Sequence, residues 1–235
     1  MRYQSLDILR GLALLGMILF HANYILEEVF YIQTLHFSSL FWYILGKSVA
    51  ITFIFISGIS FFLSVQDKNT DRIIHNALKK CFILIAIAIS ISIITYLFFY
   101  DQRISWGIIH FFALLSLISP FFIRFGLSNI FIGIIVLVLG YFLNRLDVNT
   151  NLLIPFGLTP PVYYGADYYP LFPWVGYYLI GYGAASWLIR RGYFDTLFTG
   201  SYPILGPLSY VGRHSLLIYI LHVPILYGMM LCIFL

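Results

Sequence analysis

Residues 81–99 read CFILIAIAISISIITYLFF, a run without a single charged side chain. A membrane-spanning helix needs about 20 predominantly apolar residues, because the hydrocarbon core of a bilayer is about 30 Å thick. Lys79 and Lys80 directly precede the run, and such basic flanks are typical of the cytoplasmic side. This stretch therefore predicts a transmembrane helix, and it decides the fold class.

The rest of the chain has the same character. Of its 235 residues, 61% are hydrophobic and only 9% are charged, whereas an average soluble domain carries about 25% charged residues. This composition excludes a water-soluble enzyme, a disordered protein and a nucleic-acid binder. We expect an all-α fold, a polytopic transmembrane helical bundle that forms a single domain over residues 1–235. Its predicted spans, about seven, cover residues 8–26, 40–65, 78–99, 105–123, 128–143, 171–189 and 211–235.

The basic residues predict the orientation of these spans. Lys and Arg gather before the first span and in the second, fourth and sixth loops, whereas the first loop carries Glu27 and Glu28 instead. Because cytoplasmic loops retain Lys and Arg, the N-terminus is predicted in the cytoplasm and the C-terminus outside. The polar stretch 66–77 is predicted to be a loop. The longest loop, 144–170, is rich in proline and tyrosine, and we expect it to lie against the membrane surface.

Ionisable side chains inside a bilayer are costly and usually functional. At the cytoplasmic start of the first span, Asp7 and Arg10 are three residues apart, so they can form a salt bridge or simply anchor the helix. His21 follows Arg10 by eleven residues, which is about three helical turns. Both side chains then share one helix face, about 16 Å apart along the axis. His21 can alternatively bond a neighbouring helix.

A second polar group opens the last predicted span, at Arg213, His214 and Ser215. The two basic side chains can stay hydrated and bind an anion, or serve as a positive anchor. His222 lies deeper, and it shares a helix face with Ser215 because the two are seven residues apart. Alternatively, His222 bonds backbone groups freed by Pro224.

Two more histidines complete the set of candidates. His110 lies near the outer end of the fourth span, and His36 lies in the first outer loop. Basic groups thus gather at the cytoplasmic mouth and imidazoles lie deeper and outward. A phosphate-rich donor fits the mouth, and the separation of about 16 Å matches an extended pantetheine arm. Cys81 and Cys232 show no metal-ligand spacing, so no metal site is predicted.

Five strings, spread in order over nearly the whole chain, resemble the heparan-α-glucosaminide N-acetyltransferase catalytic family. They are DILRGLALLGMILFH at 7–21, FISGIS at 55–60, WGIIHF at 106–111, PLFPWVG at 170–176 and GRHSLLIYILH at 212–222. The spacing of Arg10 and His21 also resembles the arginine, ten residues, histidine pattern of the acyltransferase-3 membrane family. Both resemblances imply transfer of an acyl group, usually acetyl, from cytoplasmic acyl-CoA to an acceptor across the membrane.

The resemblance also implies roles for single residues. Arg10 would help to hold the CoA phosphates, in a donor site formed with Asp7, Arg213, His214 and Ser215. His21 would be the catalytic base, or alternatively an acyl carrier, and His110 or His222 would orient it or donate to the oxyanion. Relatives in lysosomes have a catalytic histidine in the first luminal loop, and His36 is the only first-loop histidine here.

The chain lacks the extra spans and the luminal domain of those lysosomal relatives, so it is more similar to a prokaryotic branch. We therefore expect an integral protein of a prokaryotic plasma membrane, with acetyl-CoA as donor, a sugar-like acceptor and no metal. Its partners would be acyl-CoA, the acceptor and the bilayer, and a homo-oligomer is compatible with the sequence.

Other classes of membrane protein remain open. The main alternative is a small-molecule or proton-coupled transporter, because intramembrane histidines and an Asp–Arg pair can relay protons. A further alternative is an intramembrane serine protease that uses Ser57. Another is a purely structural membrane subunit. A retinal protein is disfavoured, because the last span has no lysine for a Schiff base.

Overall fold

The computed structural model describes residues 3–32, 37–161, 163, 165, 167–200 and 202–234. These residues form helices, two isolated β-bridges and no strand, which confirms the all-α prediction. Each predicted span coincides with a long helix. The helices are α1 (Gln4–Tyr24), α2 (Ser39–Val65), α3 (Thr70–Phe98), α4 (Ile108–Phe122), α5 (Asn129–Leu143), α6 (Leu171–Arg190) and α9 (Ser215–Phe234).

The number of membrane crossings is a separate matter from the number of helices. By length and apolar composition, 5 helical stretches of the described residues qualify as candidate spans. One of them, Ile108–Leu143, joins α4 and α5 through the 3₁₀ helix η3 (Ile123–Ser128), where Gly126 leaves helical geometry at φ 49°. The glycine-rich and aromatic α6 is not among the candidates. A count of seven spans therefore stays a prediction.

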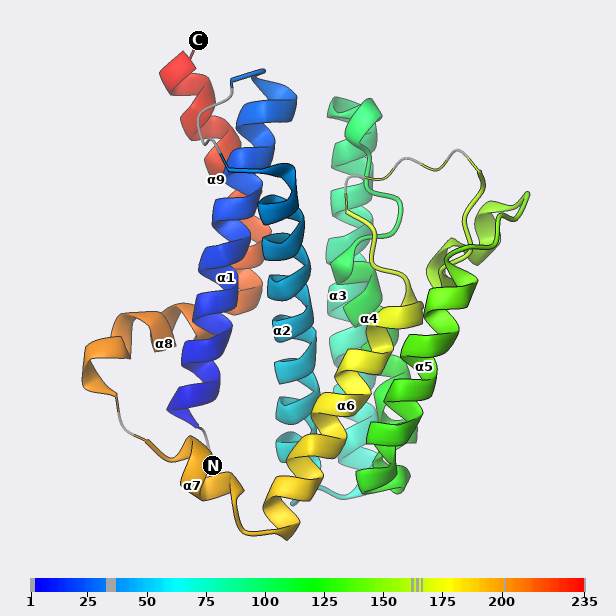
Figure 1. Ribbon diagram of the computed structural model, residues 1–235, viewed down its shortest axis with the longest axis vertical. Coiled ribbons are helices and arrows are strands. Elements are labelled where there is room, and N and C mark those ends of the chain that lie inside the picture. The colour runs from blue at the N-terminus through cyan, green and yellow to red at the C-terminus, as the bar shows by residue number, and fades with distance from the viewer. Residues whose placement is uncertain are drawn as a thin grey trace. The chain divides into compact units, whose positions relative to one another are not determined.

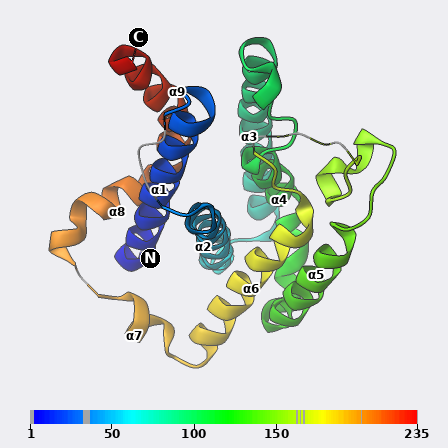
Figure 2. The ribbon, with the colours of Figure 1, turned by 45° about the horizontal axis from the view of Figure 1, so that its top comes forward.

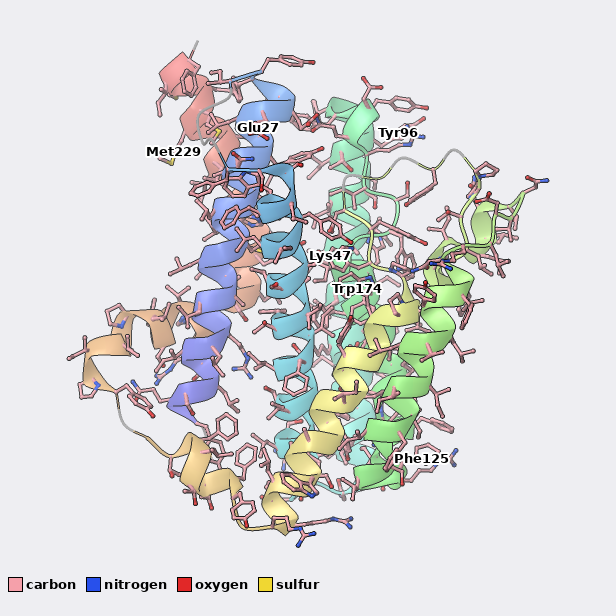
Figure 3. The ribbon with its side chains drawn as sticks, viewed as in Figure 1. Glu27, Lys47, Tyr96, Phe125, Trp174 and Met229 are labelled. Atoms are coloured by element: carbon pink, nitrogen blue, oxygen red, sulfur yellow. The ribbon has the colours of Figure 1, made fainter. Side chains whose placement is uncertain are left out.

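Three predicted boundaries are wrong. The first helix does not end at residue 26 but continues as the π-helix η1 (Ile25–Val29), so Glu27 is helical (Figure 3). Residues 70–77 are not a loop, because the Asn69 side chain accepts a hydrogen bond from the Arg72 backbone N–H at 3.1 Å and starts α3. The last span does not begin at residue 211. A separate helix, α8 (Gly206–Arg213), ends there, and α9 follows after His214.

The chain forms two compact units. Unit 1 comprises Met1–Ile56 and Leu188–Leu235, and unit 2 comprises Ser57–Trp187. The single-domain organisation stays a prediction, and each unit is described by itself.

In unit 1, α1 packs against α8 and α9, and α9 runs alongside it (Figure 1). Small residues permit this close approach: a Cβ on Gly11 would lie 2.3 Å from the Leu208 carbonyl oxygen, and a Cβ on Gly212 would lie 1.8 Å from that of Asp7. Such small-residue contacts are typical of helix pairs in membranes. They fix the end of α8, and with it the start of α9, against the first turns of α1.

The start of α1 is also tied to the chain between α6 and α8. This connection contains α7 (Phe194–Phe198) and the 3₁₀ helix η5 (Pro203–Leu205). Gln4 and Tyr202 exchange two hydrogen bonds, because the Gln4 side-chain amide donates to the Tyr202 carbonyl at 3.1 Å and accepts from its N–H at 3.0 Å. The Ser5 hydroxyl donates to the Phe198 carbonyl at 2.7 Å. The start of α1 thus contacts both the end of α7 and the residue before η5.

Unit 2 contains the end of α2, helices α3 to α5 and most of α6 (Figure 2). Glycines bring α5 and α6 together, since a Cβ on Gly133 would lie 2.7 Å from the Gly176 carbonyl oxygen. Gly58 of α2 packs in the same way, with a Cβ only 2.0 Å from the Tyr178 carbonyl oxygen. The Ser57–Gly58 pair therefore lies at a tight helix contact, which is the common role of small residues in spans.

Candidate functional site

A buried carboxylate in unit 1 holds two arginines. Asp7 lies in the first turns of α1 with a side chain that is 1% exposed, and its Oδ1 is 2.6 Å from Nη1 of Arg10. Its Oδ2 is 3.5 Å from Nε of Arg213, at the end of α8. The predicted pairing of Asp7 with Arg10 is confirmed, and the contact with Arg213 adds a member that the spacing along one helix could not reveal. We call Asp7, Arg10 and Arg213 the arginine cluster.

The arginine cluster keeps a net positive charge, because one carboxylate faces two guanidinium groups. Asp7 is almost fully covered, whereas the side chains of Arg10 and Arg213 are 20% and 47% exposed. An approaching anion therefore meets guanidinium N–H groups, and the carboxylate behind them holds them in place. Guanidinium groups bind phosphate oxygens through charge-assisted hydrogen bonds. This arrangement fits a phosphorylated ligand.

Two other residues predicted for the donor site flank the arginine cluster. His214 lies between α8 and α9, where its Nδ1 donates to the Tyr210 carbonyl at 3.0 Å. Its ring also lies 4.3 Å, between centroids, from the Tyr210 ring. Ser215 is the first residue of α9. The backbone N–H groups at a helix start attract negative charge. Because α9 begins just after His214, its N-terminus adds a favourable dipole beside the arginines.

A pair of histidines lies on α1 and α9, farther along the chain than Arg10 and Arg213 respectively. Nδ1 of His21 on α1 is 3.3 Å from Nε2 of His222 on α9, and the ring centroids are 4.8 Å apart. These two residues are 201 positions apart in sequence. Asp7 contacts Arg213, just before the start of α9, and His21 contacts His222 farther along α9, so α1 and α9 run in the same direction. Figure 3 labels Glu27, in the π-helix η1 that continues α1, and Met229, in the later part of α9.

Carbonyl contacts assign the protons of the histidine pair. Nδ1 of His222 lies 2.6 Å from the Tyr219 carbonyl oxygen, and Nδ1 of His21 lies 2.9 Å from that of Met17. Because a carbonyl only accepts, both Nδ1 atoms carry hydrogen when the rings are neutral. The single Nδ1–H of His21 is then shared between the Met17 carbonyl oxygen at 2.9 Å and Nε2 of His222 at 3.3 Å. Nε2 of His21 keeps its lone pair, with no hydrogen-bond partner in the described part of the chain.

The histidine pair and the arginine cluster share one side of α1. The helix is continuous from Gln4 to Tyr24, so Arg10 and His21 keep the predicted spacing of about three turns and about 16 Å. His222 is buried, with 6% of its surface exposed, whereas His21 is only partly covered. Of the two imidazoles, that of His21 is therefore the less covered one.

His110 has a different environment, in unit 2. Its Nδ1 accepts a hydrogen bond from the Gly107 N–H at 3.2 Å at the start of α4. The Ser92 hydroxyl donates to the Ile104 carbonyl at 2.6 Å and lies 3.3 Å from Nε2 of His110. Since that hydroxyl proton is already used, Nε2–H of His110 donates to Ser92 Oγ. Both ring nitrogens thus stabilise local structure, and a catalytic role for His110 stays a prediction.

Two other predictions concern His36 and metals. His36 lies outside the described residues. Within the described residues, no group of three or more His, Cys, Asp or Glu side chains could hold a metal ion.

The comparisons with known proteins agree with the resemblance carried by the motifs. The family model described as heparan-alpha-glucosaminide N-acetyltransferase, catalytic, matches residues 2–224. Searches of curated proteins and of solved structures give no match.

Proposed function

Because this chain belongs to the heparan-α-glucosaminide N-acetyltransferase catalytic family, a family of membrane acetyltransferases, we propose that it transfers acetyl from cytoplasmic acetyl-CoA to an acceptor on the outer side. The proposed acceptor is sugar-like and presents an amine or a hydroxyl. The observation that carries this proposal is the paired arrangement on α1. Arg10 stands in a cationic cluster at one end, and about 16 Å farther along the same face His21 has an Nε2 lone pair with no hydrogen-bond partner among the described residues.

The arginine cluster would bind the donor. Acetyl-CoA carries its phosphates at one end and its thioester at the other, joined by an extended arm. With the phosphates at Arg10 and Arg213, the arm would run along α1 and bring the thioester toward His21. Asp7 would not touch the donor but would hold the two guanidinium groups in place through the contacts at 2.6 and 3.5 Å.

His21 would act as general base. Its Nε2 takes a proton from the acceptor as the acceptor nitrogen or oxygen attacks the thioester carbonyl carbon. The tetrahedral intermediate then collapses, the carbon–sulfur bond breaks, and the CoA thiolate takes the proton back from His21. His222 would be a positioning residue, because its Nε2, at 3.3 Å, shares the Nδ1–H of His21 with the Met17 carbonyl oxygen. That hydrogen bond strengthens when His21 becomes positively charged.

Donor binding is tested by the thermal stability of the purified protein with acetyl-CoA and with free CoA. A ligand at 100 times its dissociation constant stabilises the folded state by about 2.7 kcal/mol. We expect a clear rise in Tm for the wild type, retained in Arg10→Lys and lost in Arg10→Ala. Arg103→Ala is the matched control, since Arg103 is bonded to Tyr100 in unit 2. A wild type with no shift for either ligand contradicts the proposal and favours a proton-coupled transporter.

Transfer is tested by the release of the CoA thiol when acetyl-CoA and methyl α-glucosaminide are mixed with the protein. His21→Ala should keep the acetyl-CoA shift in Tm but lower the rate by about 10²–10⁴, the usual contribution of a general base. His75→Ala is the control, because His75 is an exposed histidine of α3. Wild-type turnover in His21→Ala would exclude His21 as the base.

A further inference from the structure

Large apolar side chains are exposed between α6 and α9, outside the candidate spans. Ile204 is 93% exposed, and Tyr210, Leu197 and Tyr193 are exposed by 63%, 57% and 55%. All four belong to residues 190–210 of unit 1, which we call the connecting segment. Large apolar side chains in contact with water are unfavourable. Exposed apolar patches usually mark interaction sites, and these four side chains come from one short segment of the chain.

The connecting segment is also basic. It begins with Arg190 and Arg191, both exposed, and its single acidic residue is Asp195. The Tyr3 hydroxyl donates to Asp195 at 2.8 Å, which ties that carboxylate to the start of α1. The two arginines are thus left with a net positive field. Guanidinium groups bind phosphates, and tyrosines favour the boundary between headgroups and acyl chains.

The placement of the connecting segment suits a position in the plane of the membrane. Within unit 1, α8 lies crosswise to α1 near its start (Figures 1 and 2). Its contacts at Asp7 and Gly11 set it about one to two turns inside the start of α1. Bonds from Gln4 and Ser5 hold the rest of the segment at the same end. If α1 crosses the bilayer, a segment fixed crosswise at its end lies in the interface.

We infer that the connecting segment is an interfacial element whose partner is the headgroup layer of anionic phospholipids. Arg190 and Arg191 bind the lipid phosphates, and Ile204 and Tyr210 enter the boundary with the acyl chains. The exposed apolar side chains and the positive charge together indicate an anionic lipid. A neutral lipid surface would not explain the two exposed arginines, and a free phosphate would not explain the exposed Ile204. The inference does not depend on acetyl transfer.

The first test measures lipid preference. Detergent-purified protein is mixed with equimolar phosphatidylglycerol and phosphatidylcholine, and retained lipid is counted by native mass spectrometry. The wild type should retain phosphatidylglycerol preferentially. The double variant R190Q/R191Q should lose about five-fold in preference for each arginine. R190K/R191K should keep it, and R103Q/R145Q is the matched control from loops of unit 2. No preference in the wild type, or an undiminished preference in R190Q/R191Q, overturns the inference.

The second test measures the depth of Ile204. A nitroxide is attached to Ile204→Cys, with Cys81 and Cys232 replaced by serine, in vesicles that contain phosphatidylglycerol. The label should collide with oxygen more often than with a water-soluble nickel complex. Asp67→Cys, in the exposed link between α2 and α3, should show the opposite. A label at position 204 as accessible to nickel as the label at position 67 overturns the inference, whatever the acetylation assays show.

Discussion

Replacement of Asp7 by asparagine keeps the shape of the side chain and removes the charge that two arginines face. Breaking a buried ion pair from one side costs about 3–5 kcal/mol. Part of this cost is recovered here, because Arg10 and Arg213 are 20% and 47% exposed and can turn toward solvent. The more exposed contact, with Arg213, contributes about 0–1 kcal/mol. We therefore expect Asp7→Asn to lose about 2–4 kcal/mol of folding free energy.

This loss is measured by thermal unfolding in detergent. For a chain of this length, 1 kcal/mol corresponds to about 2–4 °C in Tm, so Asp7→Asn should unfold roughly 4–16 °C below the wild type. Asp195→Asn is the matched control, because that exposed carboxylate accepts one hydrogen bond from Tyr3 and should cost no more than about 1 kcal/mol. Adding Arg213→Gln to Asp7→Asn should restore part of the loss. Equal Tm values for Asp7→Asn and Asp195→Asn would refute the structural role assigned to Asp7.

Two further predictions concern packing and pH. Gly58→Ala should lower Tm markedly, since its Cβ would lie 2.0 Å from the Tyr178 carbonyl oxygen. Gly228→Ala, with nothing within 4 Å, should be neutral or stabilising by up to about 1 kcal/mol, and a reversed order would contradict the α2–α6 contact. Desolvation and the hydrogen bond to Asp195 raise the pKa of Tyr3. Its contribution to stability should thus be complete below about pH 10, the ordinary tyrosine pKa, and decline above it, so the wild type and Tyr3→Phe should converge in Tm at higher pH.

The helices of this chain were largely predictable, because apolar runs of membrane length leave few alternatives. Their ends were less so. The sequence did contain a local signal for the start of α3, because Asn69 is a favoured N-cap residue and its side chain accepts a hydrogen bond from the Arg72 N–H. The polar character of residues 66–77 masked this signal. The sequence signal for the break between α8 and α9 was weaker. His214 is followed by a mostly apolar run, and the close packing of Gly212 on Asp7 lies just before the break.

The candidate site divides in the same way. Helical periodicity alone predicted that Asp7 pairs with Arg10 and that Arg10 and His21 share a face. It could not predict that His222 reaches His21, because their contact spans 201 positions and depends on which helices are neighbours. The sequence also could not show which ring nitrogen of each histidine carries the hydrogen. That assignment follows from the carbonyls of Met17 and Tyr219, and a backbone group leaves no trace in the sequence.

The π-helix at the end of α1 has an evolutionary consequence. Its hydrogen bonds join an N–H to the carbonyl five residues earlier, as in the bond from the Phe30 N–H to the Ile25 carbonyl at 3.2 Å. This turn therefore accommodates one more residue than an α-helical turn. An aligned relative with an unbroken α-helix should therefore show a one-residue gap between Tyr24 and Phe30. In that relative the residues that correspond to Glu27 and Glu28 would point about 100° away from their direction here, while the register of His21 would be unchanged.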